Sequence, residues 1–479
     1  MSGPVSFLAS SIGTTEDAIR LLLSLLAGYP LSFMYRAYLY HQPNIYKHLY
    51  FIVIGLCLAV FNFGFDVYHS FLNIVLIYVV LLVTPGTKLS VGLAFFINTL
   101  YLTLGYIAHS TDTYDFKWTM PQCVLTLRLT GVVFDVYDGR KKSELSAEQK
   151  ETALTKVPSL VELLSLCYCF GGFMIGPQFS MKRYLDFING AFSHPKTGQA
   201  PDSIQPGLKR FCLGTLYIAI YQILGMFVSD DFLLSESFQN LGFLYKCGYI
   251  TVWGKNLLNK YIGSWLLVEG SITILGLSYN GKDKNGNDLW NGCANVRTPE
   301  FEYANTFRDL IHCFNYNTNQ WMAKYIFKRL RFLGNKLISQ GVTLAYLAFW
   351  HGLHSGYYNC FLLEFLMTNM ESQLVSLILK IEIVKTFQSK DYMKPVLWIL
   401  RKILITLSMG YALVSFGLLI TSKYYQIYAG MYFSLHIVFI FWPAVYFILT
   451  TYVIPRKKKY VVVPTNDVTT TLQDTPRFV

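Results

Sequence analysis

The segment Trp350-His351-Gly352 places an imidazole at the end of the apolar run 342–349. Burying a polar group in lipid costs free energy, and only a bonding partner or a reaction offsets that cost. An imidazole also changes its protonation state near neutral pH, which suits it to take a proton from a reacting group. His351 is therefore the first candidate for a catalytic residue in this chain.

His354 follows His351 at a spacing of three, which predicts that both rings share one face of a helix. The pair raises the alternative of a metal site, but it is the one close pair among the nine histidines of the sequence. The nine cysteines form no Cys-x-x-Cys motif, so we predict neither a zinc site nor a disulfide framework. A structural histidine, hydrogen-bonded inside a polar bundle core, is the stronger alternative to catalysis.

A second polar feature is the segment Phe314-Asn315-Tyr316-Asn317-Thr318-Asn319-Gln320-Trp321, in which asparagines stand at alternate positions. One interpretation is a loop whose polar side chains cap the next helix, with Thr318 or Asn319 at the N-cap. The other is a reaction site, because an asparagine offers both a donor and an acceptor to a reacting carbonyl or hydroxyl group. Asn315 precedes His351 by 36 residues, enough for one surface helix and a return into the membrane. We expect these two side chains to meet.

The stretch between Asp309 and Glu364 has no acidic residue but contains five cations, Lys324, Lys328, Arg329, Arg331 and Lys336. As one helix over 324–336, the spacing puts three of them on a common face, as in an amphipathic helix at a membrane surface. Such a helix can hold anionic lipid headgroups, or the phosphates of a soluble substrate that bears a nucleotide. Nucleic acid is not expected as a partner, because the rest of the chain is suited to lipid.

The composition indicates an integral membrane protein. Of the 479 residues, 53% are hydrophobic and 14% are charged, whereas soluble domains have about 25% charged residues. Because a spanning helix needs about 20 apolar residues, the apolar runs indicate roughly ten to twelve crossings. These runs are 19–35, 49–65, 71–84, 89–108, 124–136, 157–175, 208–228, 241–258, 261–277, 341–363, 396–420 and 427–454.

We therefore predict an all-α, polytopic fold with re-entrant segments, one of them broken at Gly171-Gly172 and Gly176-Pro177. No linker rich in Pro, Gly or Ser divides the chain, so residues 1–479 are predicted to form a single domain. The net charge of +12 is concentrated beside apolar runs, which by the positive-inside rule predicts cytoplasmic loops and a cytoplasmic C-terminus. The polar tail 456–479 is expected to be disordered.

Together, these motifs resemble the membrane-bound O-acyltransferase family. Trp350-His351-Gly352 follows the asparagine-rich segment 314–321 and the stretch Tyr325-Ile326-Phe327-Lys328-Arg329-Leu330 in the order and spacing of that family. The similarity covers most of the chain and is closest to the branch that acts on lysophosphatidylcholine. Further matching stretches are Lys117-Trp118-Thr119-Met120-Pro121, Pro158-Ser159-Leu160, Gly176-Pro177-Gln178-Phe179-Ser180-Met181 and Trp253-Gly254-Lys255.

The resemblance implies a central reaction chamber, in which an acyl chain passes from acyl-CoA to the sn-2 hydroxyl of a lysophospholipid. It also implies a functional pair, which here falls on His351 and Asn315. We expect His351 to act as general base and Asn315 to orient a substrate or donate to the developing oxyanion. The expected substrate-binding residues are Asn317, Trp321, Lys324, Lys328, Arg329, Arg331, Trp350 and His354. Acyl-CoA is expected as co-substrate, with no metal ion and no bound cofactor.

Lysophosphatidylcholine is the expected acceptor, with lysophosphatidylethanolamine or lysophosphatidylserine as further acceptors in phospholipid remodelling. The resemblance also implies residence in the endoplasmic reticulum membrane, contact with membrane lipids and assembly as a homodimer. Two alternatives stay open. One is a relative that acylates a protein or another lipid, and the other is a polytopic transporter, although no internal repeat typical of transporters is evident.

Overall fold

The computed structural model describes residues 4–109, 111, 116–141, 144–194 and 196–453, so the predicted tail 456–479 lies outside the described residues. Within these ranges the chain forms helices and no strand, apart from one isolated β-bridge between Lys282 and Asp288. The predicted all-α class is confirmed.

The α-helices are α1 (Pro4–Ile12), α2 (Glu16–Met34), α3 (Asn44–Phe63), α4 (Val67–Val83), α5 (Lys88–His109), α6 (Thr119–Gly139), α7 (Ala147–Thr152), α8 (Leu160–Tyr168), α9 (Met181–Ile188), α10 (Ile204–Gly225), α11 (Asp230–Leu233), α12 (Glu236–Gln239), α13 (Phe243–Leu275), α14 (Thr298–Tyr303), α15 (Phe307–Cys313), α16 (Tyr316–Tyr325), α17 (Lys336–His351), α18 (Ser355–Ile378), α19 (Glu382–Ser389), α20 (Met393–Leu418), α21 (Thr421–Gly430) and α22 (Ser434–Ile448). Four short helical turns add to these: π-helical Tyr35–Leu39 and Leu449–Val453, and 3-10 helical Gly64–Asp66 and Phe327–Leu333.

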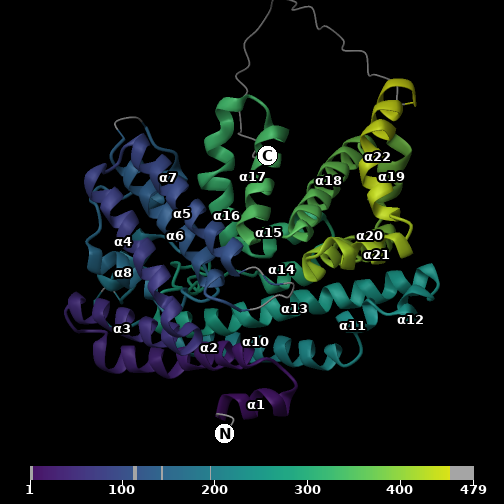
Figure 1. Ribbon diagram of the computed structural model, residues 1–479. Coiled ribbons are helices and arrows are strands. Elements are labelled where there is room, and N and C mark those ends of the chain that lie inside the picture. Colours follow the sequence, from purple (N-terminus) through teal and green to yellow (C-terminus); the bar gives the residue numbers. More distant parts are fainter. Residues whose placement is uncertain (1–3, 110, 112–115, 142–143, 195, 454–479) are drawn as a thin grey trace, which may run out of the picture.

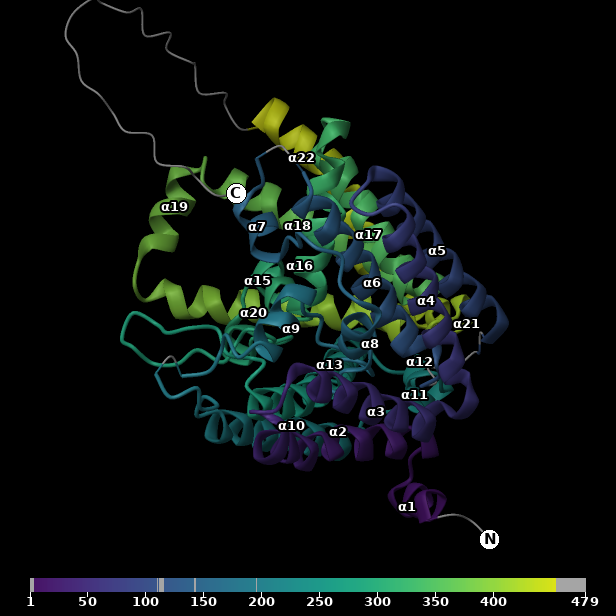
Figure 2. The ribbon, with the colours of Figure 1, turned by 90° about the vertical axis from the view of Figure 1, so that its left-hand side faces the viewer.

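Three long helices, α2, α10 and α13, lie together across the base of the molecule in Figure 1. Above this base stand α16, α17 and α18, with α4, α5 and α6 in a second group beside them (Figures 1 and 2). The close approach of α10 and α13 depends on small residues: a Cβ added to Gly214 would lie 2.9 Å from the backbone nitrogen of Leu267. Small residues at helix contacts are the usual means of close packing within a membrane.

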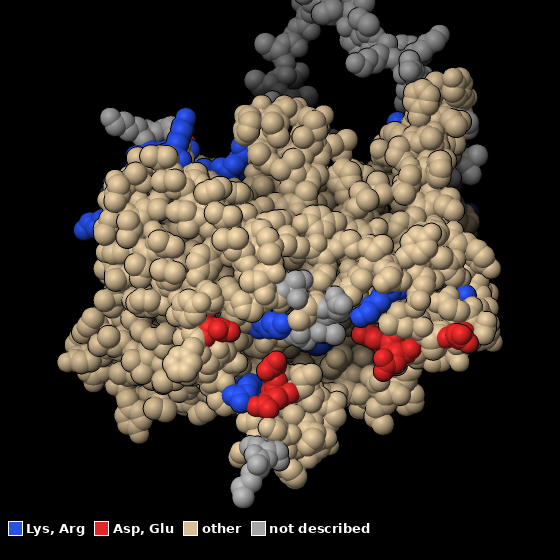
Figure 3. Space-filling view, viewed as in Figure 1, with Lys and Arg blue, Asp and Glu red and all other residues tan. Residues whose placement is uncertain are grey.

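Five helical stretches in the described part of the chain are long and apolar enough to cross a membrane: Glu16–Leu39, Asn44–Val83, Lys88–His109, Met393–Leu418 and Ser434–Tyr452. Many large apolar side chains are exposed on the surface of the protein, and Figure 3 shows a broad face that carries few charged side chains. Such a surface is expected where lipid is the solvent, so the chain is a membrane protein, as predicted. Other predicted runs, such as 124–136 in α6, are enclosed by protein.

Two predicted runs, 241–258 and 261–277, belong to one helix of 33 residues, α13. The prediction of two separate crossings there is wrong, because the residues between the runs contain no glycine or proline and continue the helix. The helix ends at Gly276, whose φ of +97° is a left-handed conformation that glycine adopts without strain. The residue Lys260 is therefore placed inside a helix and not in a loop.

The predicted break near Gly171 is confirmed, because the backbone between α8 and α9 is not helical. Arg128 of α6 donates hydrogen bonds to backbone carbonyl groups at this break, which have no helical partner. Its guanidinium donates to the backbone oxygens of Leu166 at 3.0 Å, Gly172 at 2.9 Å and Pro177 at 3.2 Å. Non-helical backbone away from water is tolerated where protein groups satisfy it in this way.

The prediction of one helix over 324–336 is wrong. α16 ends inside this range, the 3-10 turn Phe327–Leu333 follows, and α17 begins at its last residue. The cause is local: Gly334 has a φ of +66°, and the side chain of Asn335 caps α17 by accepting two backbone N–H groups of its first turn. The cations of this segment do not share one helical face.

Candidate functional site

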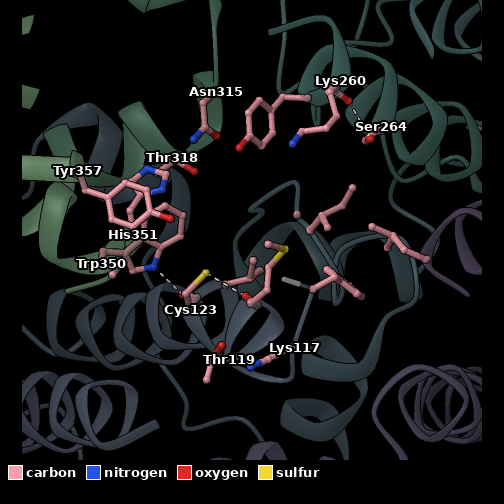
Figure 4. Close-up of a pocket in the computed structure, with 18 of the residues that line it drawn as sticks. Lys117, Thr119, Cys123, Lys260, Ser264, Asn315, Thr318, Trp350, His351 and Tyr357 are labelled. Carbon is pink, nitrogen blue, oxygen red and sulfur yellow. Dashed lines mark hydrogen bonds between the residues drawn. The ribbon is translucent and has the colours of Figure 1, made fainter. Parts of the chain in front are cut away.

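A central cavity of about 350 Å³ contains both members of the predicted pair, His351 and Asn315. Its wall includes residues of α2, α6, α13, α16, α17 and α18. Figure 4 shows Asn315, His351 and Tyr357 on one side of this cavity, with Lys260 opposite them. The fold thus brings together two polar side chains that are far apart in the sequence.

His351 is the last residue of α17. Gly352 ends the helix with a φ of +147°, in the range that side-chain-bearing residues rarely adopt, and a Cβ there would lie 2.8 Å from the Tyr357 ring. His354 then occupies the N-cap position of α18, so the prediction that both histidines share one helical face is wrong. Both histidines still line the central cavity. Among the residues that the structure describes, no three His, Cys, Asp or Glu side chains converge as a metal site would require.

The His351 ring packs among aromatic side chains. Its centroid lies 5.3 Å from the centroids of Phe361 and Phe416 and 5.6 Å from that of Tyr357. Phe361 and Tyr357 belong to α18 and Phe416 to α20, so the ring is held from two helices. Apolar surroundings of this kind favour the neutral imidazole, which is the form that can accept a proton.

Trp350 attaches the end of α17 to two other helices. Its indole Nε1 donates to the backbone oxygen of Cys123 in α6 at 2.7 Å. Its own backbone oxygen accepts a hydrogen bond from the Tyr106 hydroxyl of α5 at 2.6 Å. Trp350 is buried and lines the central cavity, so it fixes the position of the adjacent imidazole. A contact of Trp350 with substrate stays a prediction.

Asn315 has a left-handed backbone, with φ +48° and ψ +43°, immediately before α16. This region is uncommon for residues other than glycine, and such outliers concentrate at functional sites. Although Asn315 stands at the N-cap position, its side chain makes no capping hydrogen bond to the helix. It lines the central cavity and a second cavity beside it, as a residue with a role in the reaction would.

The side chains of the neighbouring asparagines, Asn317 and Asn319, form hydrogen bonds with backbone oxygens. The Nδ2 atom of Asn317 donates to the backbone oxygen of Ala294 at 2.9 Å. The Nδ2 atom of Asn319 donates to the backbone oxygens of Ile311 at 2.8 Å and Phe314 at 2.9 Å. The predicted N-cap at Thr318 or Asn319 is wrong, because both residues lie inside α16. Asn317 and Asn319 hold the backbone through their amide groups, and Asn319 also lines the second cavity, whereas Asn315 lines both cavities.

The second cavity, which we call the apolar cavity, has a volume of about 120 Å³. Four residues line both it and the central cavity: Tyr261, Trp265, Asn315 and His351. The remainder of its wall is mostly apolar and comes from α13, α14, α15, α17, α18 and α20, with Asn319 of α16 and Glu364 of α18 as polar exceptions. The candidate pair lies where the two cavities meet.

A third space, the polar cavity, has a volume of about 390 Å³ and contains three of the predicted substrate-binding residues, Asn317, Trp321 and Lys324. Gln178 lines both this cavity and the central one. The polar cavity also receives cations that the sequence did not single out. One of them is Arg297, whose guanidinium carbon lies 4.1 Å from the centroid of the Tyr316 ring; the others are Arg128 and Arg183.

Three of the predicted phosphate-binding cations have acidic partners. The Nζ of Lys324 lies 3.6 Å from Asp135, Lys328 forms an ion pair with Glu148, and Arg329 donates to Asp138 at 3.0 Å. Arg331 is exposed. The partners belong to α6 and to α7 and therefore could not be found from the local sequence, which is free of acids. A role of these cations in binding substrate stays a prediction.

Sequence reasoning missed Lys260 of α13, a charged residue that lines the central cavity. A signal was present, because a charge inside an apolar run suggests function. The same helix, however, also contains Lys246 and Lys255. The Nζ of Lys246 donates to the backbone oxygen of Gly430, and Lys255 forms an ion pair with Glu302. Only the fold separates the lysine that faces the cavity from the two that join segments.

We predict that Gly352→Ala lowers kcat, because the strained backbone and the contact with Tyr357 would displace His351. The substitution should also cost about 1–3 kcal/mol of stability. A matched control is Gly341→Ala in the same helix, where an added Cβ meets no atom within 4 Å. This control should keep its activity and stabilise the helix by up to about 1 kcal/mol. Turnover and thermal unfolding of the two purified variants check the prediction, and full activity of Gly352→Ala would contradict it.

Comparison with known proteins shows the family of this chain. The sequence profile of the membrane-bound O-acyltransferase family matches residues 103–414. The chain is 40% identical to human Lysophospholipid acyltransferase 5 over 94% of this chain and 93% of the human protein. It is 37% identical to the Caenorhabditis elegans protein of that name over 95% and 97%. It is also 25% identical to mouse Membrane-bound glycerophospholipid O-acyltransferase 1, over 90% of each chain. The chain is therefore an acyltransferase that belongs to the membrane-bound O-acyltransferase family.

Proposed function

We propose that this enzyme transfers a fatty acyl chain from acyl-CoA to the sn-2 hydroxyl of a lysophospholipid, with lysophosphatidylcholine as the favoured acceptor. The observation that carries the proposal is the position of His351 and Asn315 at the junction of the central and apolar cavities. An imidazole and a carboxamide there face a space for reacting groups that continues into a space for a hydrocarbon chain. The names of the relatives, lysophospholipid acyltransferases, support this class of acceptor.

In the proposed reaction, the neutral His351 ring takes the proton of the sn-2 hydroxyl as its oxygen attacks the thioester carbonyl carbon. The carbonyl oxygen becomes an oxyanion, to which the Asn315 amide donates a hydrogen bond. When the intermediate collapses, the carbonyl forms again and the carbon–sulfur bond breaks. The imidazolium then returns its proton to the leaving CoA thiolate. The transfer is direct and needs no acyl-enzyme.

The polar cavity suits the nucleotide end of acyl-CoA. Arg297 supplies positive charge for phosphate groups, and the ring of Tyr316 lies beneath its guanidinium. Because Gln178 lines both the polar and the central cavity, a donor that extends from one to the other passes this side chain. Its thioester would then reach the candidate pair, with methylene groups placed in the apolar cavity.

An acceptor panel tests the proposal. Purified enzyme receives labelled acyl-CoA and lysolipids that differ in headgroup, and label is expected in phosphatidylcholine first, then in phosphatidylethanolamine or phosphatidylserine. Label in a protein or in a neutral lipid, but in no phospholipid, would favour the other acceptor classes. We further propose the endoplasmic reticulum membrane as the location and phospholipid remodelling as the process; localisation of the tagged chain elsewhere would contradict this part.

In the same assay, Asn315→Gly should lower kcat by about 10²- to 10³-fold, the usual cost of removing one donor to an oxyanion. Glycine adopts the left-handed backbone of this position freely, so the variant removes the amide but keeps the turn. Asn315→Ala should lose the same activity and, in addition, about 1 kcal/mol or more of stability. Normal turnover of a folded Asn315→Gly protein would show that the amide has no part in the reaction.

The donor site gives a separate prediction. Arg297→Gln should raise the KM for acyl-CoA about tenfold, because it removes a charge-assisted hydrogen bond to phosphate, and should change the KM for lysolipid much less. Arg308→Gln is the matched control, since Arg308 is exposed on the nearby α15. Initial rates at varied concentrations of each substrate measure both constants. An equal rise of both KM values for Arg297→Gln would contradict the assignment.

A further inference from the structure

One wall of the central cavity carries a cation that the proposed reaction does not use. Lys260 lies near the middle of α13, and Figure 4 shows its side chain directed into the cavity, opposite His351 and Asn315. Ser264, one turn further along the helix, lines the same cavity and donates to the Lys260 backbone oxygen at 2.8 Å. Tyr261 contributes an aromatic ring, whose centroid lies 5.2 Å from the Lys260 Nζ.

This wall is one face of α13, because residues 260, 261, 264 and 265 recur at the spacing of a helix. It combines a cation, a hydroxyl group and two aromatic rings. The other two lysines of the helix, Lys246 and Lys255, join α13 to neighbouring segments through Gly430 and Glu302. Lys260 differs from them in lining a space that a ligand can fill. An ammonium group directed into a cavity that a substrate occupies can bind an anionic part of that substrate.

We propose that Lys260 binds the phosphate group of the acceptor lysophospholipid. This inference rests on the proposed function, because the acceptor must carry a phosphate. In a lysophospholipid the phosphate is attached to the glycerol carbon next to the one that bears the reacting hydroxyl. An acceptor whose hydroxyl reaches His351 therefore brings its phosphate into the same cavity, where the Lys260 ammonium group can hold it.

One other charged side chain of the cavity wall, Asp17, suits the rest of a zwitterionic headgroup. Asp17 at the start of α2 is exposed, which places it toward the outside of the cavity. Its carboxylate is complementary to the positive amine that lies beyond the phosphate in a choline or ethanolamine headgroup. Lys117 also lines this cavity, and its Nζ donates to the backbone oxygen of His109 at 3.3 Å. From the inside outward, the charged groups are then the Lys260 ammonium, the phosphate of the lysolipid, its amine and the Asp17 carboxylate.

Separate sites for the two substrates follow from this assignment. The phosphates of acyl-CoA have cations in the polar cavity, such as Arg297, whereas the acceptor phosphate has Lys260 in the central cavity. The two phosphate-bearing ends thus approach the reacting atoms from different cavities. Loss of Lys260 should consequently affect the acceptor and spare the donor, which distinguishes it from a general cationic contribution to the site.

The test compares Lys260→Met, which keeps the length of the side chain without its charge, with Lys260→Arg, which keeps the charge. Lys209→Met is the matched control, because Lys209 is exposed on α10 and lines none of the three cavities. KM values for lysophosphatidylcholine and acyl-CoA are measured for each variant. Binding is measured directly with a lysophosphatidylcholine that lacks the sn-2 hydroxyl and cannot react, and with a phosphate-free analogue of the same chain. Thermal unfolding checks that each variant is folded.

Lys260→Met should weaken binding of the unreactive lysolipid, and raise the lysolipid KM, by about ten- to a hundredfold. The KM for acyl-CoA and the binding of the phosphate-free analogue should change little, and Lys260→Arg should recover most of the loss. Unchanged lysolipid binding, an equal loss for the phosphate-free analogue, or a rise confined to acyl-CoA would each overturn the inference. If Lys260→Met fails to fold, the comparison of Lys260→Gln with Lys260→Arg gives the same decision. A wild-type enzyme that makes no phospholipid would instead overturn the proposed function.

Discussion

Polar groups that are enclosed away from water must find partners inside the protein, and this constraint organises the whole structure. Arg128 satisfies the carbonyl groups of the broken segment between α8 and α9. Asp135 and Asp138 are buried and are met by Lys324 and Arg329. Each of these pairings joins segments that are distant in the sequence. His351 and Asn315 instead face the central and apolar cavities.

The same constraint explains why the candidate site is rigid. The imidazole stands at the end of a helix that Trp350 ties to α5 and α6, and aromatic rings from α18 and α20 surround it. Asn315 is fixed by a strained turn, while Asn317 and Asn319 hold the backbone on either side. A site held by packing in this way positions its reacting groups before the substrates arrive, which lowers the cost of orienting them.

The sequence was sufficient for the parts of the structure that depend on local chemistry. The cost of an imidazole in an apolar run marked His351, and glycine and proline marked the break near Gly171. It failed where distant segments decide the outcome. The acidic partners of Lys324 and Arg329 come from α6, so the local sequence alone predicts free charges. The turns at Gly334 and Gly352 ended helices that simple spacing continued. Lys260 could not be told from its neighbours, because only tertiary packing decides which lysine faces a cavity.

The proposed function depends on one enclosed imidazole that removes the proton from the acceptor hydroxyl. The most direct test is acyl transfer by purified His351→Ala, compared with His41→Ala, which removes an exposed histidine. Both proteins should fold as the wild type does by thermal unfolding. We expect His351→Ala to lose about 10²- to 10⁴-fold in turnover, the usual contribution of a general base, and His41→Ala to stay active. A folded His351→Ala enzyme with near-normal turnover would contradict this expectation.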